Sequence, residues 1–166
     1  MFKFRTMKVN VETSSHERHF EELIKAKSPM TKLDACGDPR IIRGGRLIRA
    51  SGLDELPQLL NVLRGEMSLV GPRPCTTREF EGYQAWQGER TNALPGLTGY
   101  WQVNGKNKTT FTEMIEMDIQ YAKNVSFWLD LTILLRTFPA IIGEVLESGI
   151  PAHKRRVTEK AISRNV

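Results

Sequence analysis

The sequence has 166 residues, of which 40% are hydrophobic, so the chain can bury the core of a single domain. Its 24 Lys and Arg residues against 19 Asp and Glu residues give a formal net charge of +5, which favours a phosphate-rich partner, an anionic membrane surface or a nucleic acid. Cys36 and Cys75 lie far apart and have no Cys or His at metal-ligand spacing, which excludes a disulfide framework and a zinc site.

The N-terminal segment FKFRTMKVNVE alternates apolar and charged residues, which predicts a strand over about residues 2–11. Its charges leave no apolar stretch for a secretory signal. Since alternate side chains share a face, Lys3 and Arg5 should project together. The order SSHERHFEELIK, Ser14 to Lys25, then predicts a short helix that ends before Pro29.

Arginine recurs at every third position from Arg40 to Arg49. On a helix interrupted by Gly44 and Gly45, this spacing would gather the guanidinium groups on one side. Arginines at this spacing are equally typical of a helix face that is exposed to solvent.

The stretch SGLDELPQLLNVLRG predicts a helix, because leucines at positions 56, 59, 60 and 63 form an apolar face. The helix should begin within a turn before Pro57 and end at Gly65. That places Asp54 and Glu55 at the N-terminus, where the helix dipole favours ionised carboxylates and an incoming phosphate.

Asp54 and Glu55 are adjacent and therefore cannot form a facing pair of acid and base. One can act as a nucleophile while the other binds a metal, and oxygen ligands with retained waters favour magnesium. Acidic residues in a first helical turn are also ordinary capping, so the local pattern alone leaves both interpretations open.

A strand and three turns are predicted next. Met67–Val70 indicates a short strand leading into the turn Gly71–Pro74, whose two prolines would hold Arg73 in one direction. Pro95–Gly96 and Asn104–Gly105 are further turn signals.

Two helices are predicted in the last third of the chain. Thr112–Ala122 reads as a helix capped by Thr112 or Thr110, and the amphipathic segment FWLDLTILLRTFPAII follows. The apolar region 127–146 is interrupted by charged residues and Pro139, whereas a membrane-spanning helix needs about 20 mainly apolar residues. We therefore expect this region to lie on the core or on a membrane surface.

Five blocks, taken together and in this order, resemble the bacterial sugar transferase family: FKFRTM, DPRIIRGGRLIR, LDELPQLLNVLRGEMSLVGPRP, LPGLTGYWQVNGKN and DIQYAKNVSFWLDLTILLRT. Members of this family are polyprenyl-phosphate hexose-1-phosphate transferases, also called monotopic phosphoglycosyl transferases. The resemblance covers Phe2 to about Thr137. We accordingly expect a single α+β domain over residues 1–150, predominantly helical with short strands and associated with a membrane surface, followed by a basic tail at 151–166.

The resemblance implies that Asp54 is the nucleophile, forming a covalent phospho-sugar aspartate with release of UMP, and that Glu55 binds Mg²⁺ at the diphosphate. Polyprenyl phosphate would then attack this intermediate. The resemblance and the basic pattern together assign phosphate or substrate binding to Lys3, Arg5, Arg49, Arg73, Gln102, Asn104 and Lys106. The expected partners are a UDP-sugar, undecaprenyl phosphate and the cytoplasmic face of the bacterial inner membrane, while the hexose and the oligomeric state stay open.

The sequence departs from the family pattern in two places. Lys106 stands where family members usually carry arginine, which keeps the charge but loses the planar fork and bears on nucleotide affinity. The family's hydrophobic membrane segment precedes the KFR block, at which this sequence begins. We therefore expect the chain as given to be a poor catalyst of the complete transfer to a lipid acceptor.

Two other functional classes are considered. A non-catalytic remnant would bind a nucleotide sugar or partner enzymes, but the presence of Asp54, Glu55 and Arg73 favours an enzyme, and release of UMP would separate the two. A nucleic-acid-binding protein is disfavoured, because no helix-turn-helix, RNA-recognition or zinc signature accompanies the basic charge.

Overall fold

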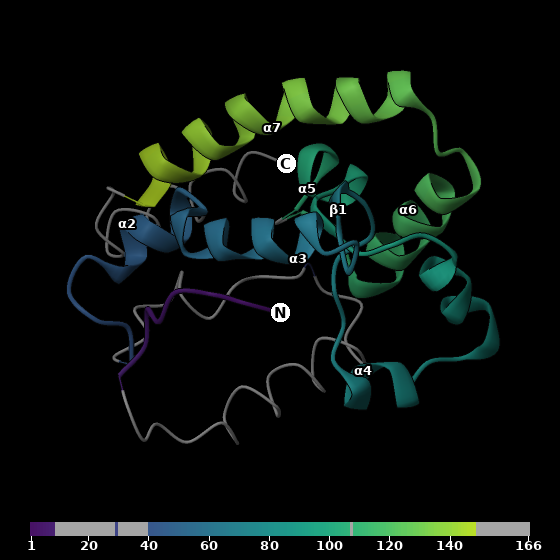
Figure 1. The fold of residues 1–166 in the computed structure, drawn as a ribbon, viewed down its shortest axis with the longest axis horizontal. Helices are drawn as coiled ribbons and strands as arrows, with labels where there is room; N and C mark the ends of the chain where they lie inside the picture. Colours follow the sequence, from purple (N-terminus) through teal and green to yellow (C-terminus); the bar gives the residue numbers. More distant parts are fainter. Residues whose placement is uncertain (9–28, 30–39, 107, 149–166) are drawn as a thin grey trace, which may run out of the picture.

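The computed structural model describes residues 1–8, 29, 40–106 and 108–148. Most of them form helices around a small sheet (Figure 1). The helical elements are α2 (Gly45–Ala50), the 3₁₀ helix η2 (Leu53–Gln58), α3 (Leu59–Leu63), α4 (Thr77–Glu81), the 3₁₀ helix η3 (Ala85–Asn92), α5 (Tyr100–Asn104), α6 (Phe111–Lys123) and α7 (Phe127–Ser148). The strands are β1 (Ser68–Val70) and β2 (Gly96–Thr98). The predicted α+β class is confirmed, whereas the predicted helix at 14–25 and the basic tail lie outside the described residues.

The two strands pair in parallel, with Ser68 opposite Gly96 and Val70 opposite Thr98. The connection between them runs through α4 and η3. A Cβ atom added at Gly71, Gly96 or Gly99 would collide with backbone atoms of the neighbouring segment. The chain that leaves β1 therefore packs backbone against backbone on the chain around β2, and only glycine permits this approach.

Helix α6 carries much of the core, as its amphipathic sequence predicts. Thr110 is the N-cap, and its hydroxyl accepts from the Glu113 N–H while the Glu113 carboxylate accepts from the Thr110 N–H. This capping box selects Thr110 over Thr112, the other predicted cap. The buried face of α6 packs with Trp101 of α5 and includes Phe111, Met114 and Ile115.

Helix α7 runs across the upper edge of the domain in Figure 1, from the side of α6 to the side of α2. Its inner face is anchored by Ile133, which is completely buried. Its outer face exposes a continuous set of large apolar side chains: Phe127, Trp128, Leu131, Leu135, Phe138, Ile142 and Leu146. Among the helices that the structure describes, none combines the length and the apolar character needed to cross a membrane.

The strand predicted at the N-terminus is wrong for the described residues 1–8. This segment forms only an isolated bridge, between Met7 and Ile41. Its other backbone groups bond to the helical segment that follows α2, because the Phe4 N–H donates to the Asp54 carbonyl at 2.9 Å and the Phe2 N–H donates to Asn61 Oδ1 at 3.0 Å. The period-2 pattern was misleading because the neighbour of this segment is a helix rather than a strand.

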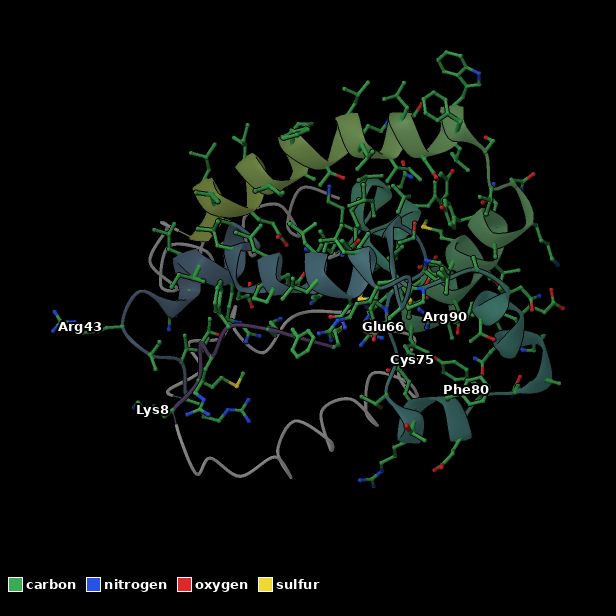
Figure 2. All side chains as sticks on the ribbon, in the orientation of Figure 1. Lys8, Arg43, Glu66, Cys75, Phe80 and Arg90 are labelled. Carbon is green, nitrogen blue, oxygen red and sulfur yellow. The ribbon has the colours of Figure 1, made fainter. Side chains whose placement is uncertain are left out.

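The predicted gathering of four arginines on one helix face is also wrong. Helix α2 begins only after Gly44, whose φ of 77° lies in the left-handed region, so Arg40 and Arg43 precede the helix. Figure 2 shows Arg43 projecting away from the body of the domain. Arg49, in the last turn of α2, instead turns inward and donates from Nη1 to Thr6 Oγ1 at 3.3 Å.

Candidate active site

The segment that carries Asp54 and Glu55 begins as predicted with both acids in its first turn. Its first part is the 3₁₀ helix η2, which starts after Gly52 in the left-handed region (φ 70°) and contains Pro57. The α-helix α3 continues it and gives way to Gly65, where φ is again positive (73°). Sequence-based boundaries are therefore confirmed here, with a tighter first turn than expected.

This helical segment buries its polar face and exposes its apolar face. Its fully buried side chains are polar: Asp54, Gln58 and Asn61. Its leucines, at positions 53, 56, 59, 60 and 63, are among the exposed large apolar residues of the domain. Because a buried polar group must find hydrogen-bond partners, this arrangement ties the segment to the N-terminal residues that lie against it.

Lys3 is the partner that brings the two acids together. Its Nζ lies 3.0 Å from Asp54 Oδ2 and 3.2 Å from Glu55 Oε1. The Asp54 side chain is 2% exposed, whereas the side chains of Glu55 and Lys3 are both 37% exposed. The Lys3 ammonium group therefore offsets part of the negative charge of the buried Asp54 carboxylate and of the more exposed Glu55 carboxylate.

A cavity of about 460 Å³ lies beside these acids, between α2, α5 and the C-terminal half of α7. Five of the predicted site residues line it: Arg49, Glu55, Gln102, Asn104 and Lys106. They come from segments up to 57 positions apart in the sequence, so the fold gathers them. This volume is in the range of cavities that hold small ligands.

Polar contacts to α7 fix two of the lining residues. Lys106 Nζ lies 3.0 Å from Glu144 Oε2, and Arg136 Nη1 donates to Asn104 Oδ1 at 3.1 Å. Glu144 also lines the cavity. No sequence pattern marks Glu144 as a site residue, because its pairing with Lys106 depends on how α7 packs.

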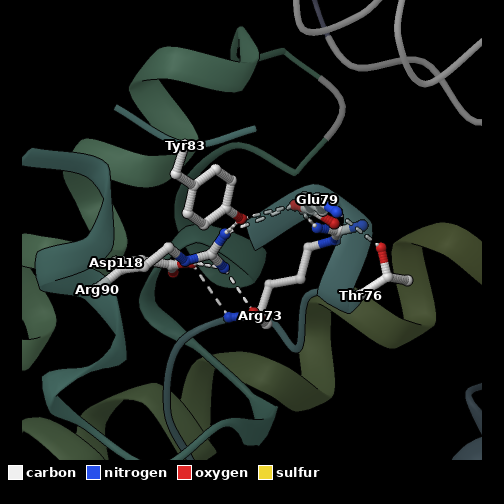
Figure 3. A network of polar contacts seen from close by, with 6 residues as sticks. All are labelled: Arg73, Thr76, Glu79, Tyr83, Arg90 and Asp118. Carbon is white, nitrogen blue, oxygen red and sulfur yellow. Dashed lines mark hydrogen bonds and ion pairs between the residues drawn. The ribbon is translucent and has the colours of Figure 1, made fainter. Parts of the chain in front are cut away.

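Arg5 and Arg73 are not among the residues that line the cavity. Arg5 is exposed on the N-terminal segment, as Lys3 is, but of these two residues it is Lys3 that contacts Asp54 and Glu55. Arg73 lies in the turn after β1, where its Nη1 is 2.8 Å from Glu79 Oε1. It belongs to a second polar cluster, shown in Figure 3.

The polar cluster consists of Arg73, Thr76, Glu79, Tyr83, Arg90 and Asp118. The carboxylate of Glu79 accepts from Arg73 and from the Tyr83 hydroxyl, at 2.8 and 2.9 Å. Arg90, whose side chain is 1% exposed, pairs with Asp118 and donates to the Tyr83 oxygen at 2.7 Å. Two guanidinium groups thus face two carboxylates, and their formal charges cancel.

Burial changes the proton affinity of two members of this cluster. It raises the pKa of Asp118 to about 6, an effect that the positive charge of Arg90 opposes. Burial also raises the pKa of the Tyr83 hydroxyl far above its ordinary value, so this group acts as a neutral donor. Because the folded state holds the proton of Asp118 more tightly than the unfolded chain does, the contribution of Asp118 to stability falls as the pH rises from about 4 to about 6.

Sequence reasoning did not identify Glu79, Tyr83, Arg90 or Asp118 as site residues. For Asp118 a signal was present, because it follows Met114 by four positions and Ile115 by three, which puts an acid on the apolar face of α6. An acid in that place predicts a buried partner. Arg90 lies in a 3₁₀ helix without a comparable pattern.

Magnesium, predicted at Glu55, fits the chemistry of the donor groups at the site. Glu55 lines the cavity and offers a carboxylate there, whereas its sequence neighbour Asp54 is 2% exposed and is not among the lining residues. Within residues 1–8, 29, 40–106 and 108–148, no group of three or more His, Cys, Asp and Glu side chains could hold a metal. An ion bound at Glu55 would have to take one or two carboxylates from the protein and further oxygens from a bound diphosphate and water.

Comparisons with known proteins agree with the geometry. The family described as bacterial sugar transferase matches residues 1–144. The chain is 41% identical over 142 residues to galactosyl transferase CpsE of Streptococcus agalactiae, covering 85% of this chain and 31% of that protein. It is 40% identical over 141 residues to undecaprenyl-phosphate galactose phosphotransferase of Salmonella typhimurium, covering 85% and 30%.

A third relative, UDP-glucose:undecaprenyl-phosphate glucose-1-phosphate transferase of Caulobacter vibrioides, is 50% identical over 114 residues, with 64% of this chain and 43% of that protein covered. The chain thus spans less than half the length of these three relatives. Since the family match covers most of the sequence and identity reaches 40% to 50%, the chain belongs to the bacterial sugar transferase family.

Proposed function

We propose that this domain transfers a hexose-1-phosphate from a UDP-sugar to a polyprenyl phosphate, with Asp54 as the covalent nucleophile. The observation that carries the proposal is a cavity lined by Glu55 together with Arg49, Gln102, Asn104 and Lys106. Asp54 is buried next to Glu55, and Lys3 Nζ contacts the carboxylates of both. The relatives named as undecaprenyl-phosphate transferases of galactose or glucose phosphate support the same donor and acceptor classes.

In the first half-reaction, a carboxylate oxygen of Asp54 forms a bond to the phosphorus that bears the sugar. The bond from that phosphorus to the bridging oxygen breaks, and UMP leaves with the electron pair. Lys3 holds Asp54 Oδ2 at 3.0 Å and so orients the nucleophile. The cationic side chains of Arg49 and Lys106 in the cavity would stabilise charge on the leaving phosphate.

In the second half-reaction, a phosphate oxygen of the polyprenyl phosphate attacks the phosphorus of the aspartyl intermediate. The bond to Asp54 breaks, which regenerates the carboxylate and gives a polyprenyl diphosphate sugar. The acceptor headgroup lies at a bilayer surface, so the domain must dock there. The exposed apolar face of α7 is our candidate for that contact. We propose that the domain docks through it on the cytoplasmic face of the inner membrane.

The proposal is tested by incubating the chain with a panel of UDP-sugars and Mg²⁺, and measuring UMP release together with the intact mass of the protein. A magnesium-dependent release of UMP and a mass increase of one hexose phosphate are expected for the accepted sugar. Tight binding of the UDP-sugar without any UMP would instead identify a non-catalytic binding protein.

Glu55→Gln is expected to raise the Mg²⁺ concentration needed for half-maximal UMP release by about tenfold or more. A bound Mg²⁺ would supply charge neutralisation at the diphosphate, and an amide is a weaker ligand for it than a carboxylate. The measurement is a Mg²⁺ titration of the initial rate. If the half-saturating concentration stays the same while the rate falls, Glu55 has no role in holding the metal.

Lys106→Met is expected to raise the KM for the UDP-sugar about tenfold, because a charge-assisted contact to phosphate contributes about 1.5 to 3 kcal/mol. Lys106→Arg should keep the KM close to that of the wild type or lower it, since charge and donors are retained. A matched control is Lys123→Met, which removes a paired lysine of α6 that is 2.7 Å from Glu89 and outside the cavity. Equal KM values for Lys106→Met and the wild type would move Lys106 out of the binding site.

A further inference from the structure

The backbone of Arg73 has an unusual set of hydrogen-bond partners. Pro72 and Pro74 carry no N–H, so Arg73 supplies the sole amide donor of the segment 72–74. This N–H donates to Asp118 Oδ2 at 3.1 Å, and the Arg73 carbonyl accepts from Arg90 Nη2. Both polar groups of the Arg73 backbone are therefore hydrogen-bonded to one ion pair, formed by Arg90 and Asp118.

The members of this arrangement differ in their access to a ligand. The side chains of Arg90 and Asp118 are each 1% exposed, so neither can be reached from solvent. The Arg73 side chain is 27% exposed and extends from the buried pair toward Glu79 (Figure 3). The ion pair can thus act on a ligand through Arg73, the residue whose backbone it holds.

The turn that contains Arg73 starts at the wall of the cavity. The Gly71 N–H donates to the Thr98 carbonyl at 2.9 Å, and Thr98 lines the cavity together with Leu97. The close approach of Gly71 to Gly96 and Gly99 fixes the beginning of the turn, and the buried ion pair fixes Arg73 two residues later.

Stability alone does not explain this cluster. A buried ion pair loses so much hydration that well-packed apolar residues in its place are often equally stable or more stable. The feature that apolar residues could not reproduce is the pair of hydrogen bonds to the Arg73 backbone.

We propose that Arg90 and Asp118 are positioning residues, which fix the Arg73 backbone so that its guanidinium is presented to a phosphate of the donor. Glu79 is the partner of that guanidinium in the present structure, at 2.8 Å. Glu79 also accepts from the Tyr83 hydroxyl at 2.9 Å and lies 3.8 Å from Arg90, so its carboxylate has partners besides Arg73. The phosphate contact rests on the proposed function, whereas the fixing of the Arg73 backbone can be tested without it.

The first experiment measures amide hydrogen exchange at Arg73 by nuclear magnetic resonance in Asp118→Asn. Asparagine keeps the shape and one acceptor oxygen but removes the charge, so exchange at Arg73 should become at least tenfold faster. Arg90→Lys gives a second, independent variant, because a lysine cannot contact Asp118, the Arg73 carbonyl and Tyr83 at once. Glu66→Gln, outside the cluster, is the control. Unchanged exchange at Arg73 in both cluster variants overturns the proposal.

The second experiment is a double-mutant cycle on UMP release with Asp118→Asn and Arg73→Met. Each single variant should lower kcat/KM about 10- to 100-fold, and the double variant should be no worse than Arg73→Met alone. If Asp118 has only a structural role, the decreases in kcat/KM of the two single variants will multiply in the double variant. That result overturns the positioning role. If the wild-type chain releases no UMP from any UDP-sugar, the proposed function fails, and the exchange experiment still decides whether the ion pair fixes Arg73.

Discussion

Asp54→Asn is expected to lower UMP release by about four orders of magnitude or more while the domain stays folded. An amide oxygen is a poor nucleophile toward phosphorus, so the covalent step is lost rather than slowed by a modest factor. Asparagine has the size of aspartate and still offers an oxygen to Lys3 Nζ, which lies 3.0 Å from Asp54 Oδ2. The measurements are UMP release, intact mass after incubation with the UDP-sugar, and thermal unfolding followed by circular dichroism.

The matched control is Glu66→Gln, which makes the same change from carboxylate to amide beyond the other end of the helical segment. Glu66 accepts a hydrogen bond from Asn61 Nδ2 and does not line the cavity. The Glu66→Gln variant should retain most of the UMP-releasing activity and should acquire the sugar-phosphate adduct. Turnover by Asp54→Asn at the wild-type rate, or an adduct on that variant, would rule out Asp54 as the nucleophile.

The double substitution Leu135→Glu and Phe138→Glu is expected to weaken binding to anionic vesicles at least 100-fold. These side chains are 64% and 68% exposed on the outer face of α7. Burying an exposed apolar side chain of this size contributes about 1.5 to 3 kcal/mol, and two carboxylates add repulsion from the anionic surface. Sedimentation with vesicles that contain anionic lipid measures the effect.

Two exposed positions of α6 provide the control, because Thr112→Glu with Gln120→Glu adds the same charge to a different helix. This control should bind vesicles nearly as well as the wild type. UMP release from a soluble UDP-sugar should stay within about twofold in the α7 variant, since the cavity is untouched, while the yield of lipid-linked product falls. Equal vesicle binding by the α7 variant and the wild type would exclude this face as the membrane contact.

Sequence patterns correctly predicted the helices and turns that depend on residues close together in the chain. Thr110 and Glu113 form a capping box at the start of α6, and the apolar spacing after Phe127 continues into a helix that ends at Ser148. The turn at Gly65 and the strand before Gly71 were likewise predicted correctly. These features depend on residues within a few positions of one another, which sequence patterns report well.

The errors arose where a distant partner decides the outcome. The N-terminal alternation of Phe2, Lys3 and Phe4 resembles a strand, but the neighbouring backbone belongs to a helix. The leucines of η2 and α3 resemble a core face, yet Asp54, Gln58 and Asn61 occupy the interior instead. Periodicity identifies two faces of a helix, and it cannot say which of them the rest of the chain will cover.

The residues of the candidate site divide in the same way, into those assigned from sequence blocks and those that depend on long-range contacts. The resemblance assigned Asp54 and five of the residues that line the cavity, because these lie in blocks of recognisable sequence. It offered nothing on Glu144 or Arg90, whose roles depend on contacts across 38 and 28 positions. Contacts of this kind need the folded chain before they can be identified.

The hydrogen bond from Arg73 to Asp118 has a consequence for synthesis on the ribosome. The two residues are 45 positions apart, so at about 5 to 20 residues per second the ribosome adds Asp118 several seconds after Arg73. During that interval the nascent chain lacks the acid that its Gly71–Pro74 turn requires. A chain released before Asp118 would contain Asp54, Glu55 and Arg73, and it would still be unable to hold Arg73 in its native place.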